Sequence, residues 1–138
     1  MNDFNRARFI RWNDVETKAC PFYIEVNKGS HRSPEEYTED HPLNEQIDVF
    51  SLGNVLYSIL MRRDIYEDMN TKNVQKVVTD GVFISIPEEV KEEFSAMENA
   101  VVVAISMCHV KNVKERKTAM EVERYLLEKL EEYGVSKF

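Results

Sequence analysis

Asp48 is the residue whose chemistry is most constrained by its neighbours, because it is an acid in an almost wholly apolar stretch. Residues 48–60 read DVFSLGNVLYSIL. An ionised carboxylate that faces a protein interior needs a partner, since an unpaired buried charge is costly. We therefore expect Asp48 to face the interior and to hold a hydrogen-bonding group there. The second interpretation is an acid at the start of a helix, where the helix dipole favours negative charge.

Cysteine and histidine side chains offer fewer possibilities. Cys108 and His109 are adjacent, but no further ligand stands at the spacing of a zinc site, so we interpret the pair as a helix end. Cys20 is far from Cys108, and the sequence has no C-x-x-C motif. This cysteine usage favours a reduced, intracellular protein, and we expect a cytoplasmic one.

The element that positions Asp48 is expected to be a central helix over 44–62. Its apolar residues fall on every side of a helical wheel, and a helix that is apolar all round is predicted to be buried all round. The stretch is too short to span a membrane and is bounded by charge, with Glu45 before it and Arg62 after it. These features indicate the central helix of a helical domain.

The rest of the chain reads as helices behind a long irregular front. Periodicity is weak over 1–33, and a short helix is expected after Ser33, which suits an N-cap. Further helices are expected over 71–79, from Pro87 to about residue 109, and from Thr118, which opens a capping box. At 138 residues, the chain is expected to form one mainly α domain.

The charge balance excludes two classes of partner. The net charge is −7 and no basic run accumulates, which argues against a general nucleic-acid binder and against binding to an anionic membrane surface. The N-terminus shows no apolar segment of the signal-peptide kind, and no apolar run reaches the length of a membrane span.

A series of short motifs resembles the second half of the large lobe of eukaryotic-type protein kinases. DFN at 3–5 is similar to the D-F-G motif, and RSPE at 32–35 is similar to the A-P-E motif. DVFSLG at 48–53 resembles D-x-W-S-x-G, RKTA at 116–119 resembles R-P-[ST]-A, and 81–87 resembles the G-x-x-x-x-x-P passage. Each motif alone is weak, but their order and spacing over the whole chain make the resemblance specific.

The resemblance implies the mainly α fold of a kinase large lobe that lacks the N-terminal β lobe. It divides the chain into an activation-segment-like part at 1–35, the central helix at 44–62 and the remaining lobe helices at 63–138. The end of the activation segment would shape the groove for a substrate peptide. Lys28 and His31 depart from the family pattern there, so specificity for Ser/Thr or for Tyr stays open.

The motif at 3–5 carries the cofactor roles of the family. Asp3 would bind the magnesium ion that bridges the ATP phosphates, since a hard carboxylate suits a hard cation. A solvated terminal acid is the plainer interpretation of Asp3. Phe4 would pack in the hydrophobic column that distinguishes active from inactive kinases, and Asn5 stands where the family has Gly.

Structural roles are implied for residues in the later motifs. Glu35 would form a buried ion pair with Arg116, whose planar fork meets a carboxylate with two hydrogen bonds. Surface charges are the plainer interpretation of both residues. Asp48 would hold the backbone of the catalytic loop, and Gly53 would allow close helix packing.

The catalytic parts that precede D-F-G in the family are absent from this sequence: the Gly-rich loop, the strand lysine, the helix glutamate and H-R-D-x-x-x-x-N. We therefore expect no catalytic residue, no kinase activity of this chain alone and no tight binding of Mg²⁺ or ATP to it. The parent would phosphorylate protein Ser/Thr or Tyr with Mg-ATP, with a protein substrate or regulatory protein as partner. The alternatives are a non-catalytic, pseudokinase-like binding module and an unrelated helical interaction domain. The oligomeric state stays open.

Overall fold

The computed structural model describes residues 7–25 and 29–134, and this part of the chain is mainly helical, as expected. The elements, in chain order, are β1 (Trp12–Asn13), β2 (Lys18–Ala19), η1 (Pro34–Tyr37), α1 (Gln46–Met61), α2 (Thr71–Asp80), α3 (Glu88–Lys91), α4 (Ala96–Cys108) and α5 (Ala119–Glu132). Within these residues, none of the helices combines the length and the apolar character needed to cross a membrane.

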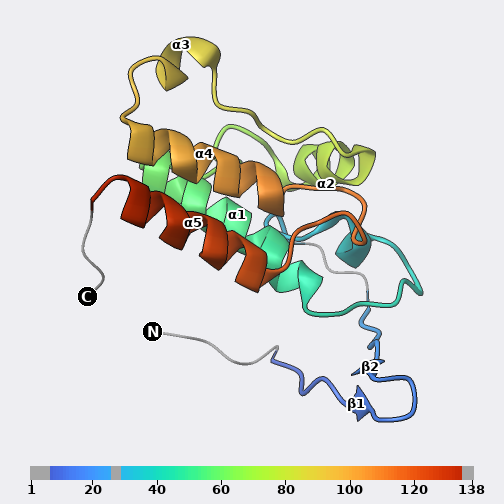
Figure 1. Cartoon of the computed structure of the whole chain (residues 1–138). Coiled ribbons are helices and arrows are strands. Elements are labelled where there is room, and N and C mark those ends of the chain that lie inside the picture. The colour runs from blue at the N-terminus through green and yellow to red at the C-terminus, as the bar shows by residue number, and fades with distance from the viewer. Residues whose placement is uncertain (1–6, 26–28, 135–138) are drawn as a thin grey trace.

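The body of the molecule consists of α1, α4 and α5, which lie side by side (Figure 1). α4 packs on both other helices. The larger hydrophobic cluster joins α1 to α2 and α4, and its buried residues are Phe50, Tyr57, Ile65, Tyr66, Val74, Val78, Ile86 and Ile105. A smaller cluster of Val49, Ala104, Cys108 and Val122 joins α1, α4 and α5. α1 therefore contributes buried residues to both clusters.

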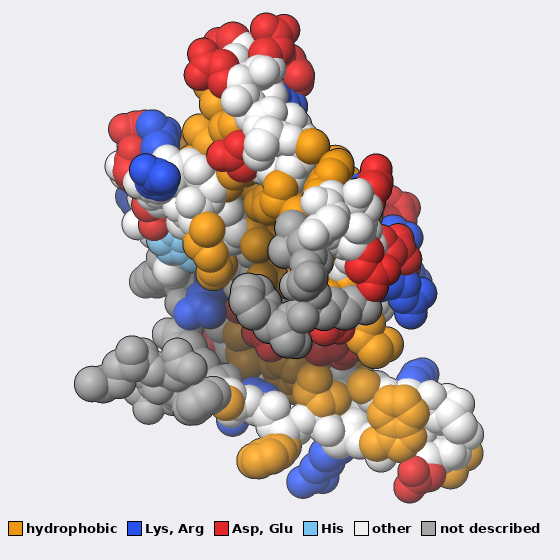
Figure 2. Space-filling model, turned by 60° about the vertical axis from the view of Figure 1, so that its left-hand side comes forward, with side chains coloured by type: hydrophobic (Ala, Val, Ile, Leu, Met, Phe, Trp, Pro, Cys, Tyr) orange, Lys and Arg blue, Asp and Glu red, His pale blue; other side chains and the backbone are white. Residues whose placement is uncertain are grey.

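The irregular front contains a β-hairpin that the sequence did not reveal. β1 and β2 pair antiparallel, and the side chain of Asn13 shapes the turn by accepting hydrogen bonds from the backbone N–H groups of Val15 and Glu16. The hairpin forms an arm beside the helical body (Figure 1). An isolated antiparallel bridge between Phe22 and Leu43 connects the base of this arm to the body. Hydrophobic side chains are exposed along this arm (Figure 2), namely Phe9, Ile10, Trp12, Val15 and Tyr23.

The long helix expected from Pro87 to about residue 109 is broken into α3 and α4, so that expectation is wrong. Ser95 starts α4 with a capping box, in which its Oγ accepts from the Glu98 N–H and its own N–H donates to the Glu98 carboxylate at 2.8 Å. Asn99 Nδ2 donates to the carbonyl of Phe94 and stabilises the break. The capping residues satisfy backbone groups that would otherwise lack partners at a new helix start.

One face of α1 is exposed, contrary to the prediction that the helix is buried on every side. Val55 is 53% exposed and Ile59 is 69% exposed. Together with Asp48 and half-buried Leu52 they follow the spacing i, i+4, i+7, i+11, which places them on one side of a helix. α4 packs along α1, and Leu52 packs partly on the smaller cluster, whereas Val55 and Ile59 remain exposed. Apolar composition all round thus indicates a helix suited to burial, but it does not supply the covering element.

Asp48 lies at the first turn of α1 and is exposed, so the expected interior carboxylate is not found. The reason is that Asp48 belongs to the uncovered stripe. Its place near the N-terminus of a helix matches the second interpretation from the sequence, an acid favoured by the helix dipole.

Candidate functional site

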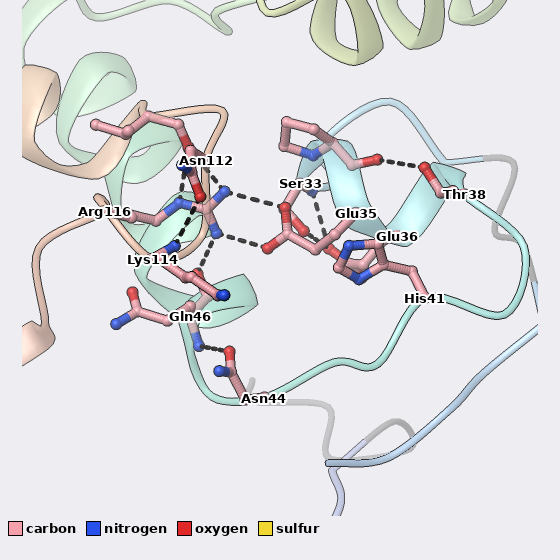
Figure 3. Close-up of polar contacts among 12 residues, drawn as sticks. Ser33, Glu35, Glu36, Thr38, His41, Asn44, Gln46, Asn112, Lys114 and Arg116 are labelled. Atoms are coloured by element: carbon pink, nitrogen blue, oxygen red, sulfur yellow. Dashed lines mark hydrogen bonds and ion pairs between the residues drawn. The ribbon is translucent and has the colours of Figure 1, made fainter.

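The most constrained polar group in the described residues is the ion pair between Glu35 of η1 and Arg116, which precedes α5 (Figure 3). Arg116 Nη1 donates to Glu35 Oε1 at 2.6 Å, and Nη2 donates to Oε2 at 3.0 Å. Both side chains are almost fully buried. The pair expected from the sequence is therefore present, with the two-pronged geometry that a guanidinium and a carboxylate favour.

Arg116 holds two further segments through its remaining N–H groups. Nη1 also donates to the carbonyl oxygen of Gln46 at 2.7 Å, while Nε and Nη2 both donate to that of Val110 at 3.0 and 2.9 Å. Its guanidinium carbon lies 5.2 Å from the centre of the Phe50 ring. Every N–H group of the side chain thus has an acceptor, and the charge is fully compensated although it is buried.

Glu35 is held in place by the short helix that carries it. Ser33 is fully buried, and its N–H and Oγ both donate to Glu36 Oε2 at 2.9 Å. Burial raises the pKa of the Glu36 carboxyl, and the two hydrogen bonds from Ser33 oppose that shift. Pro34 occupies the first helical position, where its missing N–H costs nothing. The sequence RSPEE therefore builds a rigid turn that aims Glu35 at Arg116.

Gly53 lies where α1 and the end of α4 approach most closely. A Cβ atom at this position would stand 2.6 Å from His109 Cδ2 and 2.7 Å from Cys108 Cβ. Only a residue without a side chain fits, which agrees with the close packing expected of Gly53. Cys108 is the last residue of α4 and His109 is its C-cap, as expected of a helix end.

Asn54 and His109 form a buried contact that sequence reasoning missed. His109 Nε2 lies 3.0 Å from Asn54 Oδ1, and because an amide oxygen only accepts, this nitrogen carries the proton. Burial and, to a smaller extent, the nearby positive charge of Arg116 together lower the pKa of His109 to about 4. The sequence shows a polar residue, Asn54, in an otherwise apolar helix and a histidine at the end of another helix. No sequence pattern predicts that the two side chains meet.

A second polar cluster holds residues 29–32 against the loop that follows α1. His31 Nε2 lies 2.8 Å from Asp64 Oδ2, and Ser30 Oγ lies 3.1 Å from Thr71 Oγ1. Tyr37 OH donates to the Gly29 carbonyl oxygen at 2.6 Å. A cavity of about 710 Å³ lies between this segment and the exposed stripe of α1.

The remaining site residues expected from the sequence are not brought together here. Asp3 and Phe4 lie outside the described residues, as does Lys28. Asp48 does not contact the Glu35–Arg116 pair by any hydrogen bond or ion pair. Within residues 7–25 and 29–134, no group of three or more His, Cys, Asp or Glu side chains is arranged to hold a metal ion.

A comparison with models of known protein families and with curated protein sequences finds no match for this chain.

Proposed function

We propose that this chain is part of the large lobe of a protein kinase whose full-length parent transfers phosphate from Mg-ATP to protein hydroxyls. The observation that carries the proposal is the buried Glu35–Arg116 pair, which joins an RSPE turn to an RKTA helix start. An unrelated helical domain gives no reason for these two motifs to meet in this geometry. The specificity of the parent for Ser/Thr or for Tyr stays open.

The exposed stripe of α1 gives further support. Asp48 and the exposed apolar side chains of Val55 and Ile59 lie along one side of α1, and we interpret this side as a surface that a further segment covers. In a complete lobe, the segment that carries the catalytic loop would cover this stripe, and Asp48 would hold its backbone. The proposal places the parent in the cytoplasm, with a protein substrate or regulatory protein as partner.

The chain alone is proposed to be inactive, because phosphoryl transfer depends on groups that position the nucleotide and the substrate. The test is to determine the transcript upstream of the codon for Met1 and to express the longest reading frame. We expect a strand lysine and an H-R-D loop in that frame, and transfer to a protein substrate that Asp3→Ala abolishes. A frame without these motifs, or transfer by the 138-residue chain itself, would contradict the proposal.

The second candidate is a non-catalytic, kinase-like binding module. The observation that favours it is the cavity of about 710 Å³ beside residues 29–32, a binding surface that needs no catalytic group. A longest reading frame that lacks the strand lysine and the H-R-D loop, and whose product binds a protein partner without transferring phosphate, would support this candidate over the kinase.

A further inference from the structure

A cavity of about 650 Å³ is lined in part by Glu35, the acidic member of the Glu35–Arg116 pair. It is bounded by η1, by the C-terminal end of α2 and by the loop 110–115. Figure 3 shows η1 and His41 facing the loop that carries Asn112 and Lys114. The volume is within the range of about 300–1,000 Å³ that is usual for ligand sites.

Two lysines line this cavity in a chain whose net charge is −7. Lys111 and Lys114 line the cavity and are exposed. Thr79 lines it from α2, and Lys72 and Lys76 precede Thr79 at the spacing i, i+4, i+7, which places both lysines on the same helix face. Among the described residues, none of these four lysines has a carboxylate partner within ion-pair distance.

The acidic side chains that line the cavity do not cancel this charge. Glu35 is neutralised by Arg116 at 2.6 Å. Glu115 Oε1 accepts a hydrogen bond from Asn112 Nδ2 at 2.8 Å, which leaves this one carboxylate beside the two lining lysines, Lys111 and Lys114.

The floor of the cavity is apolar, which restricts the kind of anion that fits. Pro34, Val110 and Val113 contribute hydrophobic surface between the charged positions. A bare inorganic anion would gain nothing from these side chains. A peptide with one hydrophobic residue flanked by acids matches both the floor and the rim, since interfaces combine an apolar centre with a polar edge.

The loop that forms one wall is held rigidly. Arg116 donates two hydrogen bonds to the carbonyl oxygen of Val110, and Asn112 accepts from the backbone N–H groups of Lys114 and Glu115 at 3.1 and 3.0 Å. A wall that is already ordered loses little conformational entropy on binding.

From this geometry we propose that the cavity between η1, α2 and loop 110–115 binds an acidic peptide segment of a protein partner, with a hydrophobic side chain of the peptide on Pro34 and Val113. The inference holds whether or not the parent is an active kinase. It adds a docking surface that is separate from the segment 29–32 and from the exposed stripe of α1.

The test is fluorescence anisotropy with the full chain and a short fluorescein-labelled peptide of Glu and Asp around a central Leu. The double charge reversal Lys111→Glu with Lys114→Glu is expected to weaken binding by about tenfold or more. The matched control is Arg8→Glu with Arg124→Glu, which changes the net charge equally at exposed positions outside the cavity. The control is expected to retain binding within about twofold.

Other outcomes overturn the proposal. An undetectable affinity of the wild-type chain, or an equal loss in both double variants, would show that the cavity is not a specific peptide site. Replacement of the central Leu of the peptide by Ser is expected to weaken binding, and an unchanged affinity would remove the role of the apolar floor. Equally tight binding of a single-stranded DNA of the same charge would point to a non-selective cation surface instead of a peptide site. Circular dichroism of each variant verifies that it is folded.

Discussion

The two sides of α1 differ sharply although both are rich in apolar residues. The side that carries Phe50, Gly53 and Tyr57 is packed against α4 and the core. The opposite stripe, with Asp48, Val55 and Ile59, is exposed. On the first side, the apolar pattern predicts burial and the side chains are buried, because α4 and the core supply the packing partners. An apolar pattern therefore identifies a surface that is suited to burial, but it does not identify the element that covers this surface.

The largest expected effect comes from breaking the buried ion pair between Glu35 and Arg116. Arg116→Ala is expected to lower the free energy of unfolding by about 3–5 kcal/mol, because Glu35 would remain buried without a partner. Urea denaturation of the full chain measures this. Arg116→Lys is the control: a single ammonium group replaces only part of the five-donor fork, so most of the loss should remain.

A double-mutant cycle with Glu35→Ala isolates the pair from its surroundings. The interaction free energy of Glu35 and Arg116 is expected to be about 2 kcal/mol, since the side chains are in direct contact. Strictly additive effects of the two substitutions would mean that the contact contributes nothing to stability.

The buried histidine gives a pH dependence to the packed side. Its pKa is about 4 in the folded chain against 6.5 for an ordinary histidine, so the unfolded state binds more protons between these values. The contribution of His109 is therefore complete above about pH 6.5 and is lost as the pH falls toward 4, by about 3 kcal/mol in all.

This pH dependence is measured as the free energy of unfolding between pH 4 and 7 for the wild-type chain and for His109→Gln. Glutamine keeps a hydrogen-bond donor for Asn54 and does not titrate. The wild-type chain is expected to lose more stability than the variant as the pH falls. A difference between the two curves that does not change with pH would mean that His109 has the same pKa in the folded and unfolded states, and would contradict the prediction.

Gly53→Ala sharpens the comparison by adding one methyl group to the packed side. The new Cβ would stand 2.6 Å from the His109 ring, so the free energy of unfolding is expected to fall by about 1–3 kcal/mol. Ser58→Ala, on α1 and only half-buried, is the matched control and should change stability little. Thermal denaturation of the two variants in parallel is sufficient to distinguish them.

The smallest effect is expected on the exposed stripe. Ile59→Ala should change the stability of this chain by less than about 0.5 kcal/mol. Ile105→Ala, in the core on α4, should cost about 2–5 kcal/mol. If the longest reading frame supplies a covering segment, Ile59→Ala should become costly in that longer protein, and an unchanged small effect there would show that the stripe stays uncovered.

Much of the fold was predictable because its signals are local. The helix starts at Ser33 and Thr118 follow from N-cap residues with a glutamate three positions later. The same signal at Ser95 and Glu98 lies inside a continuous apolar periodicity, and this periodicity favours one long helix over the observed break. The hairpin was not predicted because its turn depends on the side chain of Asn13 and not on a glycine pair.

The site was predictable only where motif order supplied long-range information. The Glu35–Arg116 contact followed from the resemblance of two distant motifs to one family. Asn54 and His109 offered no such guide, and whether Asp48 is buried depends on what covers the stripe rather than on its neighbours in sequence. Periodicity identifies a face, whereas contact between faces is a property of tertiary packing.

The span of the Glu35–Arg116 contact has a kinetic consequence. The two residues are 81 positions apart. Closing a loop of that length costs conformational entropy, and this cost is met before the contact can stabilise the chain. The pair is therefore expected to form after the rate-limiting step of folding. Its removal by Glu35→Ala should accelerate unfolding in stopped-flow experiments and leave the refolding rate nearly unchanged. The pair would then set the lifetime of the folded chain and not the speed at which it is reached.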